Sequence, residues 1–175
     1  MTRDQAVGPL TRSIRVDRMA RAQGDFIVTA TPEECAALAA DFGIPAIRDL
    51  VGRFRVGGTL ENLKVTGTVE AVVTQICTVS LDPFEASVSE PVEVTFTDGE
   101  IPTGHDAEDV EVPDPIVNGR VDFGTLTAEF LAMGLDPYPR KPGVTFDLAE
   151  PDPEDAPLAG LRALQGDRAP QGNKD

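Results

Sequence analysis

The chain has 175 residues, of which 41% are hydrophobic and 26% charged, and its formal net charge at pH 7 is −15. A chain of this length fits one domain with extensions, and a body of about 150 residues would bury roughly 70% of its unfolded surface. The two cysteines, Cys35 and Cys77, are too few for a disulfide framework. The first residues lack the layout of a signal peptide, and no apolar run is long enough for a membrane span. We therefore expect a cytoplasmic protein.

Two short strands and a helix are expected near the start of the chain. Residues 12–19 and 24–30 have the apolar pattern of short strands. Thr31 offers a hydroxyl N-cap, Pro32 suits the first helical position and Glu34 stands three residues after the cap, which together predict a helix over 32–42.

A period of two then predicts a sheet. Residues 63–77 and 84–96 each place apolar side chains on one face of a strand. The short connections favour antiparallel pairing, because parallel strands need crossover segments. Pro91 cannot donate to a ladder, so it predicts an edge, a bulge or a bend. We therefore predict an α+β fold with an antiparallel β meander of about five to seven strands, which can curl towards a barrel.

Acidic residues are concentrated in two segments. Residues 98–115 have seven acidic and no basic residues and no periodic apolar face, which predicts an acidic loop. Residues 147–175 have seven acidic and three basic residues with few large apolar ones, which predicts a disordered tail after a single domain over 1–146. Such segments attract basic partners such as ribosomal proteins, and the alternative is a solvated surface that keeps the protein soluble.

A second helix is expected between these two segments. Asn118-Gly119 is the dipeptide that favours a tight turn. Asp122 can then cap a helix over 123–133, and Gly134 can end it.

Few side chains suited to catalysis are present. The single histidine, His105, lies in the acidic loop, where a Ser-His or Cys-His pair would lack a rigid support. Cys77 is in phase with the apolar residues of its strand, so we expect a buried, inert thiol. Phosphate-loop, dinucleotide, Cys-x-x-Cys and calcium-loop patterns are missing, and 5% aromatic residues supply no stacking platform for nucleic acid. We expect no enzyme, no cofactor and no small-molecule substrate.

Several motifs nevertheless follow one another in a distinctive order. They are Cys77 followed by Leu-Asp-Pro-Phe at 81–84, a strand rich in Val and Glu, the acidic loop, Val-Asp-Phe-Gly at 121–124, and Leu-Asp-Pro-Tyr-Pro-Arg-Lys-Pro-Gly at 135–143. In this order they resemble the YceD family, the large ribosomal RNA subunit accumulation proteins, in an alphaproteobacterial-like form and over a core of about residues 45–146.

The chain departs from that family at its cysteines. Many members have Cys-x-x-Cys before the Pro-Phe segment and further cysteines after the second helix, which together resemble a zinc site. Here Ser80 takes the place of the second cysteine, and the proline-rich segment 135–143 takes the place of the later ones. A lone thiolate cannot complete a site of four ligands, so we expect no metal site.

The resemblance implies a non-enzymatic factor in ribosome biogenesis that supports accumulation of large-subunit ribosomal RNA. Its implied partners are ribosomal proteins, assembly factors or pre-ribosomal particles. Two alternatives remain, namely a metal-dependent hydrolase or nuclease built on the acidic loop, and a general protein-interaction module.

Four residues are candidates for binding. Prolines stiffen 135–143, so Tyr138 is expected to pack there, while Arg140 and Lys141 face solvent or hold an anionic partner. A direct grip on RNA would need Arg120, Arg140 and Lys141 to gather with the N-terminal arginines into one patch.

Overall fold

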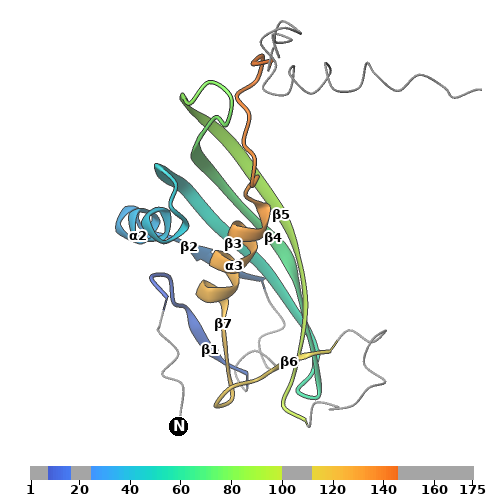
Figure 1. Cartoon of the computed structure of the whole chain (residues 1–175). Helices are drawn as coiled ribbons and strands as arrows, with labels where there is room; N and C mark the ends of the chain where they lie inside the picture. The colour runs from blue at the N-terminus through green and yellow to red at the C-terminus, as the bar shows by residue number, and fades with distance from the viewer. Residues whose placement is uncertain (1–7, 17–24, 100–111, 146–175) are drawn as a thin grey trace, which may run out of the picture. The chain divides into compact units, whose positions relative to one another are not determined.

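The computed structural model describes residues 8–16, 25–99 and 112–145 (Figure 1). Its elements, all within the compact unit Met1–Val144, are β1 (Ser13–Arg15), β2 (Asp25–Thr29), α2 (Pro32–Phe42), β3 (Ala46–Thr59), β4 (Asn62–Ile76), β5 (Pro83–Thr97), β6 (Asp114–Pro115), β7 (Arg120–Asp122) and α3 (Phe123–Gly134). Most of the acidic loop, His105 and the tail over 147–175 lie outside the described residues. No helix among the described elements is both long and apolar enough to span a membrane.

Within the described residues, the main sheet has five strands in the order β2-β3-β4-β5-β6. Strands β2 to β5 form an antiparallel meander, which confirms the predicted α+β class. β6 departs from the meander, because it pairs with the end of β5 in parallel, at Phe96 and Thr97. The sheet keeps two separate edges, β2 and β6, so it does not close into a barrel. A second sheet of two antiparallel strands joins β1 to β7, far apart in sequence.

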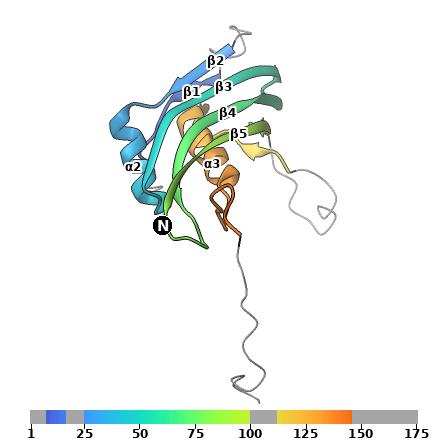
Figure 2. The ribbon, with the colours of Figure 1, turned by 90° about the horizontal axis from the view of Figure 1, so that it is seen from above.

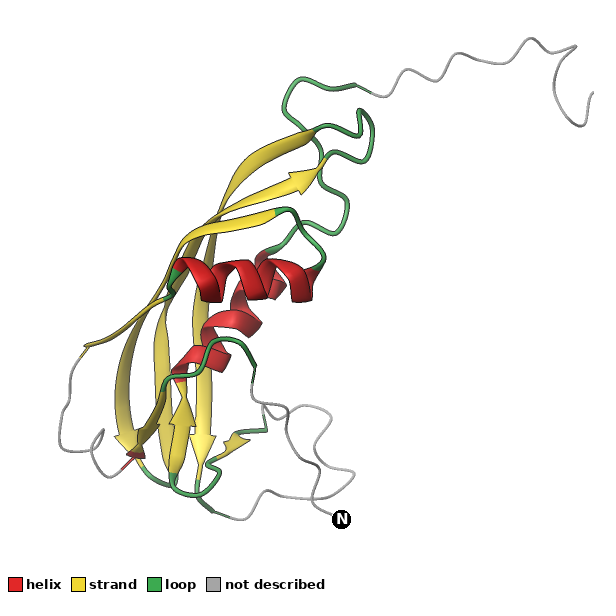
Figure 3. Ribbon diagram, turned by 90° about the vertical axis from the view of Figure 1, so that its left-hand side faces the viewer, coloured by secondary structure: helices red, strands yellow, loops and turns green. Residues whose placement is uncertain are grey.

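Helices α2 and α3 lie on the same side of the main sheet, which curves around α3 (Figures 2 and 3). Alternate residues of each strand therefore face the helices and form the core. These core residues are mainly aliphatic: Val28, Leu50, Phe54, Val56, Val65, Val69, Val73, Val88 and Val92. The period of two in the sequence arises because only one face of the sheet is covered.

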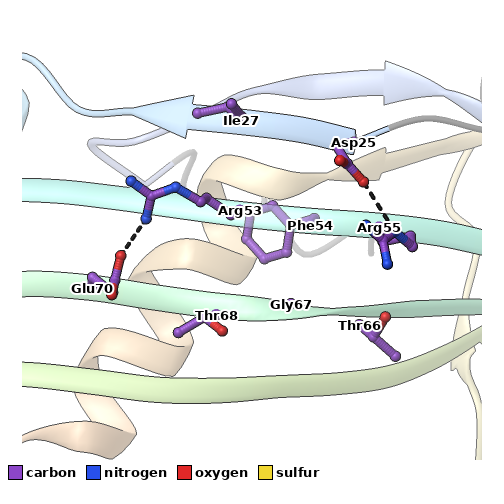
Figure 4. A pocket seen from close by; sticks show the side chains of 9 residues that line it. All are labelled: Asp25, Ile27, Arg53, Phe54, Arg55, Thr66, Gly67, Thr68 and Glu70. Atoms are coloured by element: carbon purple, nitrogen blue, oxygen red, sulfur yellow. Dashed lines mark hydrogen bonds and ion pairs between the residues drawn. The ribbon is translucent and has the colours of Figure 1, made fainter.

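The other face of the sheet is open, and cross-strand ion pairs line it. Arg53 pairs with Glu70, and Arg55 pairs with Asp25 at 3.0 Å, around a shallow hollow of about 500 Å³ (Figure 4). Exposed ion pairs of this kind contribute about 0.2–1 kcal/mol each. The basic groups of this hollow are thus matched by neighbouring carboxylates rather than left for an external anion.

Helix α2 begins and ends where its sequence predicts. The Thr31 hydroxyl accepts a hydrogen bond from the Glu34 amide at 3.3 Å, and the Glu34 carboxylate accepts one from the Thr31 amide at 2.8 Å. Gly43 ends the helix with a φ of 65°, a left-handed conformation that costs glycine little. Glu34 also pairs with Arg12 at 2.8 Å, which ties the N-terminal segment to α2.

Helix α3 is anchored at its first turn. The Asp122 side chain accepts hydrogen bonds from Gly124 and Thr125 of the helix, and a third from the Arg12 amide at 2.8 Å. A Cβ at Gly124 would lie 2.6 Å from the Arg12 amide nitrogen, so the close approach of residues 10–12 requires glycine there. The helix then carries the chain across the concave face of the sheet.

Candidate functional site

Two segments far apart in the sequence meet at one end of the sheet. The first is the turn between β4 and β5, residues 77–82, and the second is the arm that follows α3, residues 135–143. The Thr78 amide donates a hydrogen bond to the Pro139 carbonyl at 2.8 Å, and the Gln75 side chain donates one to the Asp136 carbonyl at 3.0 Å. Because Gln75 is itself buried, the arm is attached to the end of β4 and not only to the surface of the turn.

The sulfur of Cys77 lies at the centre of this junction. Its side chain is fully buried, and Sγ accepts hydrogen bonds from the amides of Ser80 and Lys141, each at 3.4 Å. The Ser80 hydroxyl, followed by the backbone amides of Ser80, Lys141 and Val79, lowers the pKa of the Cys77 thiol from 9.0 to about 6, while burial acts in the opposite direction. The junction therefore favours a thiolate held by donors from both the turn and the arm.

This environment confirms one part of the expectation for Cys77, its burial. The thiol is buried, as its position on the apolar face predicted. The N–H donors lower the pKa of this thiol, but reactivity also needs access to Sγ, which its burial denies, so the inert character of Cys77 stays a prediction. The signal in the sequence is Ser80 three residues after the cysteine, but the donor from Lys141 comes from 64 residues away and could not be inferred from spacing.

We expect the stability of the domain to depend on the ionisation of Cys77. Between about pH 6 and pH 9 the native state holds a thiolate while the unfolded chain holds a thiol, so the free energy of unfolding should rise with pH across this window. This contribution is complete above pH 9 and is lost as the pH falls through 6. Urea unfolding at a series of pH values, with Cys77→Ala as the control, measures it. Equal slopes for the two proteins would contradict the prediction.

The expectation that Tyr138 packs is wrong. Its side chain is 74% exposed, and so is that of Leu81 on the turn. The Asp136 carboxylate accepts a hydrogen bond from the Tyr138 amide at 2.8 Å, which holds the backbone of the arm rather than the ring. The prolines of the arm thus stiffen a segment that presents its aromatic ring to solvent.

Tyr138→Ala should therefore leave the stability of the domain nearly unchanged. Substitutions of exposed side chains usually alter the free energy of unfolding by no more than about 0.5 kcal/mol. Equilibrium denaturation of the two proteins tests this expectation. A loss of several kcal/mol would show that the ring packs in solution.

The adjacent basic residues of the arm differ in their surroundings. Lys141 lies 3.7 Å from the carboxylate of Asp82 on the turn. Arg140 is exposed, and the structure shows no ion pair for it with any described residue. Of the two, Arg140 is the one available to a partner.

Arg120 lies elsewhere, so the structure does not gather the candidate cations into one patch. It belongs to β7, before α3, whereas the arm follows α3. Its guanidinium donates to the hydroxyl and the carbonyl of Ser13, both at 2.8 Å, and so links β7 to β1. Among the described residues its contacts are those of a structural link.

Arg120 also lines a cleft of about 910 Å³ between α3, β6 and the small sheet. Asp114 and Glu129 line the same cleft. Partial burial, and then the charge of Asp114, raise the pKa of Glu129. Within the described ranges, no group of three or more His, Cys, Asp or Glu side chains is placed to hold a metal ion.

Comparison with protein families gives a match that contains the junction. The model of the family described as "Large ribosomal RNA subunit accumulation protein YceD" matches residues 65–164, more than half of the chain. The chain belongs to the YceD family. The match begins within β4, later than the expected start near residue 45, and it includes the turn, α3 and the arm. Neither the curated proteins nor the solved structures provide a match.

Proposed function

We propose that this protein is a non-enzymatic cytoplasmic factor that supports the accumulation of large-subunit ribosomal RNA. The observation that carries the proposal is the YceD family match over residues 65–164. The junction of turn and arm supports it as a place for a macromolecular contact, because two of the motifs that carry the resemblance, at 77–84 and 135–143, meet there and expose Leu81 and Tyr138.

The proposed route of action is contact with a protein component of the precursor particle. The net charge of −15 supports a protein over a nucleic acid as the direct partner, since an acidic chain repels phosphate. Without the segments 98–115 and 147–175 the chain has a net charge of −4, so most of the negative charge is available in segments that can attract a basic protein.

Depletion of the protein from the cells that make it tests this function. We expect the large-subunit ribosomal RNA and the large-subunit particles to fall, while the small-subunit RNA in the same extract serves as an internal control. Restoring the wild-type chain should restore the large subunit. Unchanged large-subunit RNA after depletion would count against the proposal.

The alternative of a hydrolase or nuclease rests on the density of carboxylates in residues 98–115. A variant that lacks residues 100–112 separates the two functions. If purified wild-type protein has a metal-dependent activity that the variant lacks, this result supports the hydrolase or nuclease interpretation. If wild-type protein has no such activity, that interpretation fails.

A further inference from the structure

We propose that Leu81, Tyr138 and Arg140, here called the tip, dock onto a protein partner that offers an apolar hollow beside a carboxylate. This inference rests on the proposed function for the identity of the particle, and it deepens that function by naming the surface and the chemistry of the partner.

The tip exposes a large apolar side chain and an aromatic ring to solvent. Leu81 and Tyr138 are both 74% exposed, and they stand on two segments that hydrogen-bond to each other. Leu81 also has a φ of 61°, a left-handed conformation that favours glycine. A large apolar side chain held outward on strained backbone indicates a role outside the fold of the domain.

Hydrogen bonds and prolines constrain the backbone that carries the tip. The arm is held to the turn at Pro139 by the Thr78 amide, at 2.8 Å, and by the Thr78 hydroxyl, at 3.2 Å. Pro137 and Pro139 restrict the backbone on either side of Tyr138. Binding through a side chain whose backbone is already ordered loses less conformational entropy, which favours a docking role.

Charge decides between a protein and an RNA as the occupant. The turn and arm together contain two acidic residues, Asp82 and Asp136, and two basic ones, so their formal charge is zero. Lys141 faces Asp82, whereas the structure shows no ion pair between Arg140 and any residue that it describes. A surface that binds RNA gains affinity from many phosphate contacts. The tip offers a single arginine within a strongly acidic chain.

The same composition suits a protein interface. Tyr and Arg are enriched among the residues that dominate binding energy, where an aromatic ring fills a pocket and an arginine meets a carboxylate. The open face of the sheet gives a contrast. Ile27 is 66% exposed there, but the charged groups beside it already pair with one another. A single exposed apolar residue of this kind needs no partner.

The test begins with photocrosslinking in cells. Tyr138 is replaced by p-benzoyl-phenylalanine in the full chain, and Ile27 is replaced in the same way as the control. We expect one discrete adduct from position 138 that resists ribonuclease and is absent from position 27. An adduct destroyed by ribonuclease, an adduct common to both positions, or no discrete adduct would each overturn the proposal.

The protein in the adduct is then identified by mass spectrometry, purified and titrated against the full chain. Leu81→Gly and Arg140→Glu should each weaken binding by about tenfold or more, whereas Ile27→Ala should not change it. Leu81→Gly keeps a residue that tolerates the left-handed conformation, and circular dichroism verifies that every variant is folded. Equal affinities for all four proteins would also overturn the proposal.

The outcomes distinguish a failure of the docking proposal from a failure of the proposed ribosomal function. If depletion lowers large-subunit RNA but the tip gives no discrete adduct, the docking surface is wrong and the ribosomal role stands. If the tip docks a purified partner while depletion leaves ribosomal RNA unchanged, the ribosomal role is wrong and the docking surface stands.

Discussion

Phe123→Ala should lower the free energy of unfolding by about 3–5 kcal/mol, the range for truncating a buried aromatic side chain. Phe123 is the first residue of α3 and is fully buried. Its ring stacks on that of Phe26 with centroids 5.3 Å apart, and it lies 5.2 Å from that of Phe54. One side chain thus joins the helix to strands β2 and β3, so its removal leaves a cavity where three elements meet.

Met133→Ala is the matched control on the same helix. Met133 is 63% exposed, so its truncation should change stability by no more than about 0.5 kcal/mol. Urea denaturation of both variants beside the wild type gives the comparison. Similar losses for the two variants would show that the aromatic contact does not hold α3 on the sheet.

Gly67→Ala should destabilise the domain by about 1–3 kcal/mol or more, as overpacking does in a tightly packed site. Gly67 in β4 pairs with Phe54 in β3, and a Cβ at this glycine would lie 2.0 Å from the carbonyl oxygen of Arg53. Because the neighbour is backbone and not a flexible side chain, the two strands must separate or shift register to admit the methyl group.

Gly57→Ala in β3 provides the control for the loss of glycine alone. No atom lies within 4 Å of a Cβ built there, so the added methyl group meets only open space. Thermal unfolding of the two variants should show a lower midpoint for Gly67→Ala only. Equal midpoints would mean that β3 and β4 accommodate a side chain at position 67 without strain.

These two contacts position the candidate site. Phe123 holds the start of α3, and the arm leaves the end of the same helix towards the turn after β4. Gly67 lies in β4, whose end carries Gln75 and Cys77, the residues that receive the arm. The tip is therefore presented by a helix and a strand that are both anchored in the core.

Elements with local signals are predictable from the sequence alone. The capping of α2 by Thr31 and Glu34, and of α3 by Asp122, depends on groups within three residues of one another. The meander follows from a period of two with short connections, and the order of the motifs resembles that of the family whose model matches the chain. Such features are predictable because adjacent residues meet whatever the rest of the chain does.

Which surfaces are covered depends instead on contacts between distant segments, which the fold reveals. The fold pairs β1 with β7, engages Arg120 with Ser13, places β6 parallel to β5 and leaves the sheet open. It also exposes Tyr138, against the expectation that this ring packs, and gives Cys77 a donor from Lys141. The physical reason is that exposure and pKa depend on atoms brought together across tens of residues, and the periodicity of a single segment carries no information about that packing.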